Sequence, residues 1–265
     1  MINKISFPRL GINLNLNQVA IDLPFLGEVR WYGILIGIGI ILAYIYCSYV
    51  AKREKEDPEM LTDLLLCALP VSIICARTYY VIFSWDNYKD NLTDVFKIWE
   101  GGIAIYGAVI GAVITAAIVF KVKKVNILKM FDICCLGLLI GQAIGRWGNF
   151  VNAEAYGYYT NGLLGMSING ALPVHPTFLY ESLWNAAGFL ILSKLNKKRP
   201  FYGFTFFSYL IWYGFGRFII EGMRADSLYL GFMRVSQVVA FLCIGIGIIG
   251  YWCCMNKKEK ERSSK

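Results

Sequence analysis

The chain of 265 residues has few of the side chains that soluble enzymes use for covalent catalysis or metal binding. It contains one histidine, His175, and no cysteine pair with the short spacing that holds zinc. It also lacks a Gly-x-Ser-x-Gly elbow and a recognisable serine, histidine and aspartate set. These absences argue against the common metal-dependent and serine-dependent enzymes, and we expect no metal and no cofactor.

Charge is also scarce, since 17% of the residues are charged and 57% are hydrophobic. Together with a mean hydropathy of +0.52, this composition indicates an integral membrane protein. The formal net charge of +8 would suit a nucleic-acid partner only if the basic residues shared one soluble face. They instead form short clusters between apolar runs, so we expect no nucleic-acid partner.

Two further features are missing at the sequence level. The eight cysteines lie inside apolar runs or at their ends, so we expect no disulfide framework. The first thirty residues lack the basic start, apolar core and small-residue cleavage site of a signal peptide. We therefore expect them to remain on the mature protein.

Long apolar runs predict an all-α integral membrane protein with seven transmembrane helices. The expected spans are residues 32–51, 61–85, 101–120, 127–147, 177–195, 201–221 and 235–255. They form a single polytopic membrane domain over residues 1–256, with a small extracytoplasmic region between the fourth and fifth spans. Residues 257–265 follow as a charged cytoplasmic tail, which we expect to be disordered.

The distribution of lysine and arginine predicts how the chain is oriented. The segments that follow the first, third, fifth and seventh spans, together with the adjoining span ends, hold sixteen of these residues, and the opposite segments hold seven. Because basic residues concentrate on the cytoplasmic side, the N-terminus is predicted to lie outside and the C-terminus in the cytoplasm.

Three arginines fall at one predicted depth in the membrane. Arg77 lies sixteen residues beyond Leu61, Arg146 sixteen beyond Met130 and Arg217 sixteen beyond Phe201, each counted from near the cytoplasmic edge. At about 1.5 Å per residue this is ~24 Å into a hydrocarbon layer of roughly 30 Å. Tyr106 and Tyr32 are expected near the same plane, just below the outer surface.

The stretch from Gly145 to Glu154 has the strongest functional signal. Charged residues inside a membrane are costly and usually functional, and Arg146 ends a long apolar run. Asn149 and Asn152 add neutral hydrogen-bond donors, and neighbouring glycines allow close approach of a ligand. We therefore expect Arg146 to bind a polar group.

Structural alternatives stay open for the other residues. Arg77 could extend to the headgroups or pair with a carboxylate, and Arg217 could pair with Glu221 on the same helical face. Tyr32 and Tyr106 could be ordinary aromatic residues of the membrane interface.

Two other sets of residues have a structural interpretation. Helix-packing surfaces are expected at two groups of glycines: Gly33, Gly37 and Gly39, and Gly101, Gly102, Gly107 and Gly111. His175 is expected to make a local hydrogen bond.

Arginine is suited to bidentate binding of phosphate, and a phosphate at this depth belongs to a lipid. Such a site could bind an anionic phospholipid, move it across the bilayer or cleave it. A phospholipid transporter or flippase is the main alternative, although no charges mark a path to the cytoplasmic side. A seven-helix receptor is a weaker alternative, because the tail is short and the loops lack cysteines.

Residues Gly145 to Gly157 read GRWGNFVNAEAYG and closely resemble the signature of prolipoprotein diacylglyceryl transferases. The resemblance extends over most of the chain. It includes Arg30–Gly33, Gly101-Gly102, Tyr106-Gly107, His175–Thr177, Leu179–Glu181, Tyr213-Gly214 and Arg217–Glu221.

This resemblance implies a multi-pass enzyme of the bacterial cytoplasmic membrane, with its active site near the outer leaflet. Its partners would be phosphatidylglycerol and preprolipoprotein signal peptides with a lipobox cysteine. It would transfer the diacylglyceryl group to the cysteine thiol, forming a thioether and releasing glycerol phosphate.

The resemblance also assigns residues. Arg146 matches the phosphatidylglycerol-binding arginine of the signature, and Arg217 with Glu221 matches a second essential cluster. The predicted catalytic residues are Arg146, Arg217, Tyr106 and Glu221. Phosphatidylglycerol binding is predicted for Arg146, Asn149, Asn152, Glu154, Gly157, Tyr32, Arg77 and Tyr213.

Tyr106 departs from the family pattern, because many members have histidine there. With an unperturbed pKa of about 10, tyrosine is a poor base at neutral pH. We expect Tyr106 to position the lipid by hydrogen bonding while another group or solvent takes the thiol proton. The cationic Arg146 and Arg217 would favour the thiolate.

Overall fold

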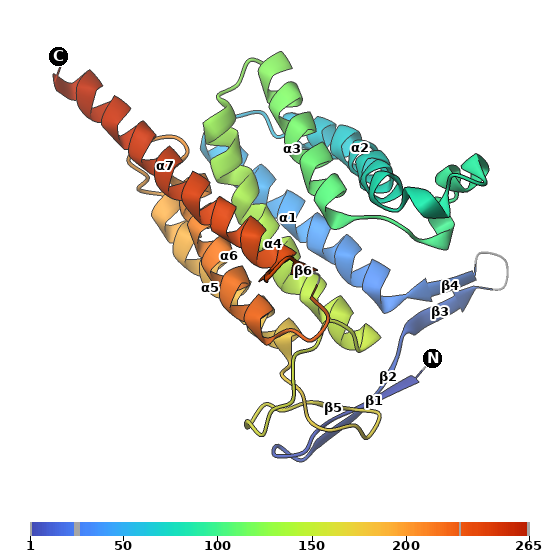
Figure 1. The fold of residues 1–265 in the computed structure, drawn as a ribbon. Coiled ribbons are helices and arrows are strands. Elements are labelled where there is room, and N and C mark those ends of the chain that lie inside the picture. Colours follow the sequence, from blue (N-terminus) through green and yellow to red (C-terminus); the bar gives the residue numbers. More distant parts are fainter. Residues whose placement is uncertain (1, 24–26, 228, 264–265) are drawn as a thin grey trace. The chain divides into compact units, whose positions relative to one another are not determined.

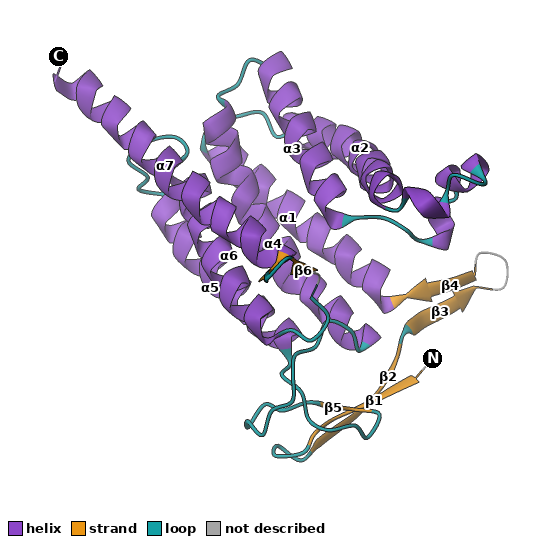
Figure 2. Cartoon of the chain, in the orientation of Figure 1, coloured by secondary structure: helices purple, strands orange, loops and turns teal. Residues whose placement is uncertain are grey.

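The computed structural model describes residues 2–23, 27–227 and 229–263, and it is mostly helical (Figure 1, Figure 2). Contacts divide the chain into two compact units. The first unit combines Met1–Cys47 with Phe131–Lys265, and the second is Ser48–Met130.

Seven α-helices lie within the described ranges. They are α1 (Trp31–Arg53), α2 (Glu59–Phe83), α3 (Ile105–Val122), α4 (Ile127–Asn152), α5 (Thr177–Asn196), α6 (Phe204–Met223) and α7 (Val235–Ser263). Each of the seven apolar runs therefore forms a helix. Apart from the start of α3 and the ends of α4 and α7, the predicted boundaries differ by three residues or fewer.

Those three boundaries correct the sequence prediction. Helix α3 starts at Ile105 rather than residue 101, because Gly101 and Gly102 adopt positive φ angles of 92° and 73°. Helix α4 continues past residue 147, so Asn149 and Asn152 belong to its last turn.

The expectation of a disordered tail is wrong for the described residues, because α7 continues to Ser263. Lys257 and Glu261 are four residues apart on this extension, a spacing that favours helical structure. Residues 264 and 265 of the predicted tail lie outside the described ranges.

The expectation of an all-α chain is correct only in part, because the described residues are mostly helical but also form seven short strands. They are β1 (Ile2–Phe7), β2 (Ile12–Asn17), β3 (Val19–Leu23), β4 (Gly27–Arg30), β5 (Ser167–Ile168), β6 (Tyr229–Leu230) and β7 (Met233–Arg234). The antiparallel sheet β2–β1–β5 and the hairpins β3–β4 and β6–β7 account for all of them. Apolar and polar residues alternate along residues 12–17, the period typical of a strand.

Among the described helices, α1, α2, α3, α4 and α7 are long and apolar enough to cross a membrane. Helices α5 and α6 carry more polar residues, and several of these face the protein interior. The buried polar residues of the two helices are Thr177, Glu181, Ser182, Asn185, Asn196, Thr205 and Glu221. The chain thus has the helices of a multi-pass membrane protein.

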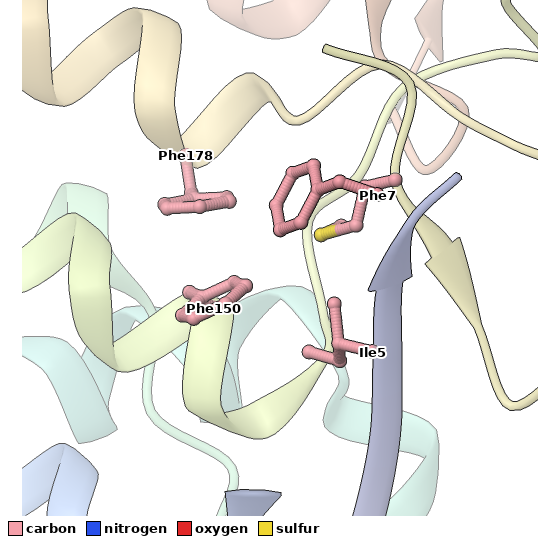
Figure 3. Packing of buried hydrophobic residues seen from close by; sticks show 5 residues of the cluster. Ile5, Phe7, Phe150 and Phe178 are labelled. Atoms are coloured by element: carbon pink, nitrogen blue, oxygen red, sulfur yellow. The ribbon is translucent and has the colours of Figure 1, made fainter. Parts of the chain in front are cut away.

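In the first unit, the N-terminal sheet packs against the ends of two helices (Figure 3). Ile5 and Phe7 of β1 are buried against Phe150 of α4 and Phe178 of α5. The Phe150 and Phe178 rings stack with their centroids 4.4 Å apart. Asn3 also donates to the carbonyl of Val151 at 3.2 Å, which satisfies an acceptor near the end of α4. This sheet therefore fixes the segment that follows Arg146.

Helices α5 and α6 are joined through two tryptophans. The Trp184 and Trp212 rings stack at 4.4 Å, and each indole N–H donates to the other's backbone carbonyl, at 3.0 and 3.1 Å. A Cβ at Gly216 would lie 2.1 Å from Trp184 Nε1, and one at Gly188 would lie 2.4 Å from Trp212 Nε1. The absence of a Cβ at each glycine therefore leaves room for the indole ring from the other helix.

Asp132 fixes α4 against the start of α6. This fully buried carboxylate accepts backbone N–H bonds from Gly203 and Phe206, both at 2.8 Å. It therefore caps the N-terminus of α6, where unpaired amides and the helix dipole favour a negative charge. Since Arg146 lies 14 residues beyond Asp132, and Arg217 lies 13 beyond the start of α6, both are about 20 Å along their helices.

The second unit contains α2, α3 and three short 3-10 helices, η1 (Trp85–Asn87), η2 (Leu92–Phe96) and η3 (Ile98–Glu100). Gly107 and Gly111 of α3 lie against Cys75 of α2, where added Cβ atoms would approach its carbonyl oxygen to 2.4 Å and its Cβ to 2.9 Å. The predicted helix-packing role is confirmed for these two glycines, but it is wrong for Gly33, Gly37 and Gly101, where nothing among the described residues lies within 4 Å of an added Cβ.

Candidate active site

The centre of the site is a buried carboxylate that the site prediction did not include. Glu181 lies in the second turn of α5, and its side chain is 6% exposed. Its Oε2 lies 2.6 Å from Arg146 Nη2, and its Oε1 lies 2.9 Å from Arg217 Nη1. One carboxylate thus joins two predicted arginines from separate helices, which confirms that they lie at one level.

A usable signal for Glu181 exists in the sequence. The residue lies four positions after Thr177, or about 6 Å below the outer end of its predicted span. Counting depth from the outer end would have placed this carboxylate close to the plane of the arginines.

Arg217 also makes the pair that was considered as its structural alternative. Its Nη2 lies 2.8 Å from Glu221 Oε2, one helical turn away, and 3.3 Å from Ser236 Oγ. Glu221 is almost fully buried. Arg217 is therefore held between two carboxylates and the start of α7.

Arg224 is a third cation at this site, and sequence reasoning did not assign it a role. Its Nη1 lies 4.0 Å from Glu181 Oε1, while its Nε and Nη2 donate to Asp226 at 3.0 and 2.8 Å. Burial raises the pKa of Asp226, but the hydrogen bond and charge of Arg224 outweigh this effect and lower it overall. Asp226 therefore stays ionised and orients Arg224.

Of the three guanidiniums around Glu181, that of Arg146 is the most accessible. Its side chain is 24% exposed, against 14% for Arg217 and 13% for Arg224. Arg217 and Arg224 both act on Arg146 as neighbouring like charges. Glu181 offsets this repulsion, so the cluster presents a cationic edge at Arg146.

The signature segment forms a chain of hydrogen bonds that begins at Arg146. Its Nη1 donates to Asn149 Oδ1 at 3.3 Å, and Asn149 Nδ2 donates to Glu154 Oε1 at 2.8 Å. Asn152 Nδ2 reaches the same Glu154 oxygen at 3.4 Å. The structure therefore brings these four predicted residues together.

The backbone after α4 explains how Glu154 returns to the helix end. Ala153 and Ala155 have φ angles of 53° and 55°, in the left-handed region that alanine rarely adopts. The resulting reversal lets the Glu154 N–H donate to the Asn149 carbonyl at 3.0 Å. This unusual backbone is maintained where predicted ligand-binding residues meet.

Gly157 holds the loop against the ends of α5 and α6. An added Cβ would lie 2.7 Å from both His175 Cβ and the Met223 carbonyl oxygen. Gly157 also forms a β-bridge with Arg224. His175 Nδ1 lies 3.2 Å from the Tyr180 hydroxyl, so its predicted local hydrogen bond is confirmed.

Two predicted tyrosines belong to the same unit. The Tyr32 ring packs on Gly148 of α4, where an added Cβ would lie 2.6 Å from Tyr32 Cδ2. Tyr213 lies close enough to Arg217, Arg146 and Glu181 to interact electrostatically with each. Tyr213 therefore borders the arginine cluster.

Arg77 and Tyr106 belong to the second unit. Arg77 donates one hydrogen bond from Nε and two from each terminal nitrogen to backbone carbonyls. These acceptors lie on Val95, Gly101, Gly102, Asp94 and Lys97, at 2.6 to 3.4 Å. Arg77 thus holds the loop before α3, rather than pairing with a carboxylate.

Tyr106 is the second residue of α3, and its ring lies 6.3 Å from that of Tyr79. The roles assigned to Tyr106 and Arg77 in lipid binding stay predictions.

Comparison with known proteins agrees with the resemblance seen in the signature. A family model described as prolipoprotein diacylglyceryl transferase matches residues 18–253. A Listeria innocua protein named phosphatidylglycerol–prolipoprotein diacylglyceryl transferase is 48% identical over 250 residues, covering 89% of this chain and 90% of that protein. Proteins of the same name from Lysinibacillus sphaericus and Finegoldia magna are 49% and 48% identical. Their alignments cover 89% and 84% of this chain, and 91% and 90% of the relatives. The chain therefore belongs to the prolipoprotein diacylglyceryl transferase family.

Proposed function

We propose that this protein transfers the diacylglyceryl group of phosphatidylglycerol to the lipobox cysteine of preprolipoproteins. The products are a thioether-linked lipoprotein precursor and glycerol phosphate, and the reaction begins lipoprotein maturation. The observation that carries the proposal is the convergence of Arg146 and Arg217 on Glu181, in a chain whose named relatives act on phosphatidylglycerol.

In this proposal Arg146 binds the headgroup phosphate through its exposed edge, and Arg217 adds positive charge behind it. The cysteine sulfur bonds to the terminal carbon of the diacylglyceryl group as the carbon–oxygen bond to phosphate breaks. The electron pair of that bond goes to the phosphate oxygen, where the arginines stabilise the growing charge. The thiol proton leaves to solvent or to a side chain.

The carboxylates keep the arginines in place before the lipid binds. Without Glu181, mutual repulsion of the guanidiniums would drive them apart, and substrate binding would have to reassemble them. Glu221 holds Arg217 in the same way, which supports its predicted catalytic role through positioning. Asn149, Asn152 and Glu154 extend the polar surface beside Arg146, where the glycerol hydroxyls of the headgroup would bind.

For the membrane we propose seven spans over residues 1–256 as one polytopic domain, with the N-terminus outside. Helices α5 and α6 would be the two remaining spans, because several of their polar side chains are buried in the protein and would not contact lipid. The basic residues at the ends of α1, α3 and α7 favour the cytoplasm for those ends. The arginine site, which lies near the C-terminal ends of α4 and α6, would then be near the outer leaflet.

Reconstitution tests the proposal directly. Purified protein in proteoliposomes is supplied with phosphatidylglycerol labelled in its acyl chains and with a lipobox peptide. Label transferred to the peptide thiol, with stoichiometric glycerol phosphate, is expected for the wild type. Arg146→Ala should lower this rate by at least about a hundredfold, as loss of a group that stabilises transition-state charge does. Its circular dichroism spectrum should not change.

Two results would contradict the proposal. Lipid movement between leaflets without a thioether product would favour a flippase, and near-normal turnover by Arg146→Ala would remove the arginine from the mechanism. Arg9→Ala is the matched control, because Arg9 is exposed in the turn between β1 and β2 and is expected to retain full turnover.

A further inference from the structure

Arg234 is a buried arginine that the mechanism above does not use. It ends β7, immediately before α7, and it is 8% exposed. Its Nε donates to the Tyr229 hydroxyl and its Nη2 to the Tyr158 hydroxyl, both at 3.2 Å. The guanidinium carbon lies 5.6 and 5.8 Å from the centroids of the same two rings.

The partners of Arg234 are all neutral. Within residues 2–23, 27–227 and 229–263 no carboxylate oxygen forms an ion pair with it, and its buried Nη1 has no hydrogen-bond acceptor. Arg146, Arg217 and Arg224 each have a carboxylate at 2.9 Å or less. A buried cation with an unsatisfied donor raises the free energy of the protein, so binding of an anionic acceptor at Arg234 would be favourable.

Arg234 lies beside the arginine site. Ser236, two residues further on, accepts from Arg217 Nη2 at 3.3 Å. The charge of Glu221 also acts on Tyr229, a direct partner of Arg234. The N-terminal end of the 29-residue helix α7 adds further positive potential through the helix dipole.

The neighbouring carboxylates are already engaged with other groups. Glu181, Glu221 and Asp226 pair with Arg146, Arg217 and Arg224. Glu154 accepts hydrogen bonds from Asn149 and Asn152. Because the first three arginines already hold carboxylates, an incoming anion reaches Arg234 without breaking an ion pair.

We propose that Arg234, together with Tyr229, forms a second phosphate-binding subsite that holds the phosphate ester of the substrate headgroup or of the released glycerol phosphate. This inference rests on the proposed function. Phosphate suits the subsite because guanidinium donors match two of its oxygens, and the phenol hydroxyl supplies a further donor.

Tyr229 supports the proposal through its own hydrogen bonds. Bonds from Arg234 and Tyr158 lower the pKa of Tyr229, which makes its remaining O–H a stronger donor. Both tyrosines are half exposed, although the guanidinium between them is buried. A phosphate oxygen that displaces the Tyr158 hydroxyl would exchange a neutral acceptor for a charged one, which is the stronger partner of arginine.

The test uses the full chain in proteoliposomes with Arg234→Gln, Tyr229→Phe and the control Arg9→Gln. Two quantities are measured: the KM for phosphatidylglycerol and the inhibition constant of added glycerol phosphate. Arg234→Gln should raise at least one of them about tenfold, since a hydrogen bond to a charged group is lost. Tyr229→Phe should raise the same quantity about threefold. Arg9→Gln should change neither.

The two quantities identify the source of the phosphate. A rise in KM alone indicates the lipid headgroup, and a rise in the inhibition constant indicates the leaving group. Values for Arg234→Gln within twofold of wild type overturn the proposal, even if its melting temperature falls, because that pattern shows a purely structural arginine.

A binding measurement separates this inference from the proposed function. Glycerol phosphate should raise the melting temperature of the detergent-solubilised wild type and not that of Arg234→Gln. If the wild type forms no thioether but this difference is seen, the transferase proposal fails and the subsite stands. If thioether forms and the ligand stabilises both proteins equally, the subsite is refuted.

Discussion

Replacing Glu181 by glutamine removes the negative charge on which Arg146 and Arg217 converge and changes side-chain volume very little. The carboxylate makes contacts of 2.6 and 2.9 Å with the two guanidiniums. Hydrogen bonds to charged groups contribute about 1.5–3 kcal/mol each, and the amide of glutamine retains one acceptor oxygen. Because Arg146 is 24% exposed and partly screened by water, a net loss of ~2–3 kcal/mol is expected.

If the whole loss raises the activation free energy, turnover decreases about 30- to 150-fold, because roughly 1.36 kcal/mol corresponds to each factor of ten in rate. The assay is the initial rate of acyl-label transfer to a lipobox peptide at saturating phosphatidylglycerol. Glu28→Gln is the matched control, because Glu28 makes an exposed contact of 3.6 Å with Arg30. Less than a twofold change is expected for it.

Turnover of Glu181→Gln within threefold of wild type would refute the positioning role of this carboxylate. A loss of helical signal or of monodisperse protein in detergent would instead show that the fold depends on Glu181. Glu181→Asp then separates the two effects, since it keeps the charge but shortens the reach. Glu181→Asp should restore more of the wild-type stability than of the wild-type turnover.

Three further substitutions test other parts of the structure. Tyr106→Phe should raise the KM for phosphatidylglycerol about two- to tenfold with little change in kcat, as loss of a neutral hydrogen bond to the lipid predicts, and unchanged kinetics would remove the hydroxyl from the site. Gly216→Ala should lower the free energy of unfolding by about 1–3 kcal/mol in thermal or denaturant assays, because the new Cβ would clash with the Trp184 indole. Gly245→Ala is its control, as no atom lies within 4 Å of that Cβ position, and equal effects of the two would contradict the packing argument. Arg77→Gln should expose the loop before α3 to limited proteolysis, because its hydrogen bonds to backbone carbonyls are lost, and an unchanged cleavage pattern would count against this anchoring role.

The level of Arg146 and Arg217 was predictable because the rise of an α-helix is constant. Asp132 of α4 caps the start of α6, and Arg146 and Arg217 lie 14 and 13 residues beyond these points, so similar counts along the two helices give similar depths. The contact between Asn149 and Glu154 was predictable only as proximity within one motif. Its geometry depends on two left-handed alanines, a conformation that the residue type does not favour.

Other features could not be obtained from local pattern alone. Arg224 follows α6 in a segment predicted to lie outside the membrane, where an arginine is ordinarily solvated. Its β-bridge with Gly157 holds it near Glu181, and this long-range pairing is not visible in the sequence. The pairing of β1 with β5 joins segments about 160 residues apart, and the sequence of neither strand indicates which strand it will pair with. The depth of Arg77 stays a prediction, and a count along the helix does not reveal that backbone carbonyls surround its guanidinium.

The N-terminal sheet has a consequence for how the protein is made. The Lys4 N–H donates to the Asn169 side chain at 2.8 Å, and Ile5 and Phe7 pack on Phe178. The first strand to leave the ribosome must therefore wait, with apolar side chains uncovered, until more than two thirds of the chain has been synthesised. Assembly of the arginine site is accordingly a late event in biogenesis, so a half-synthesised chain does not yet hold the segment after Arg146 in place.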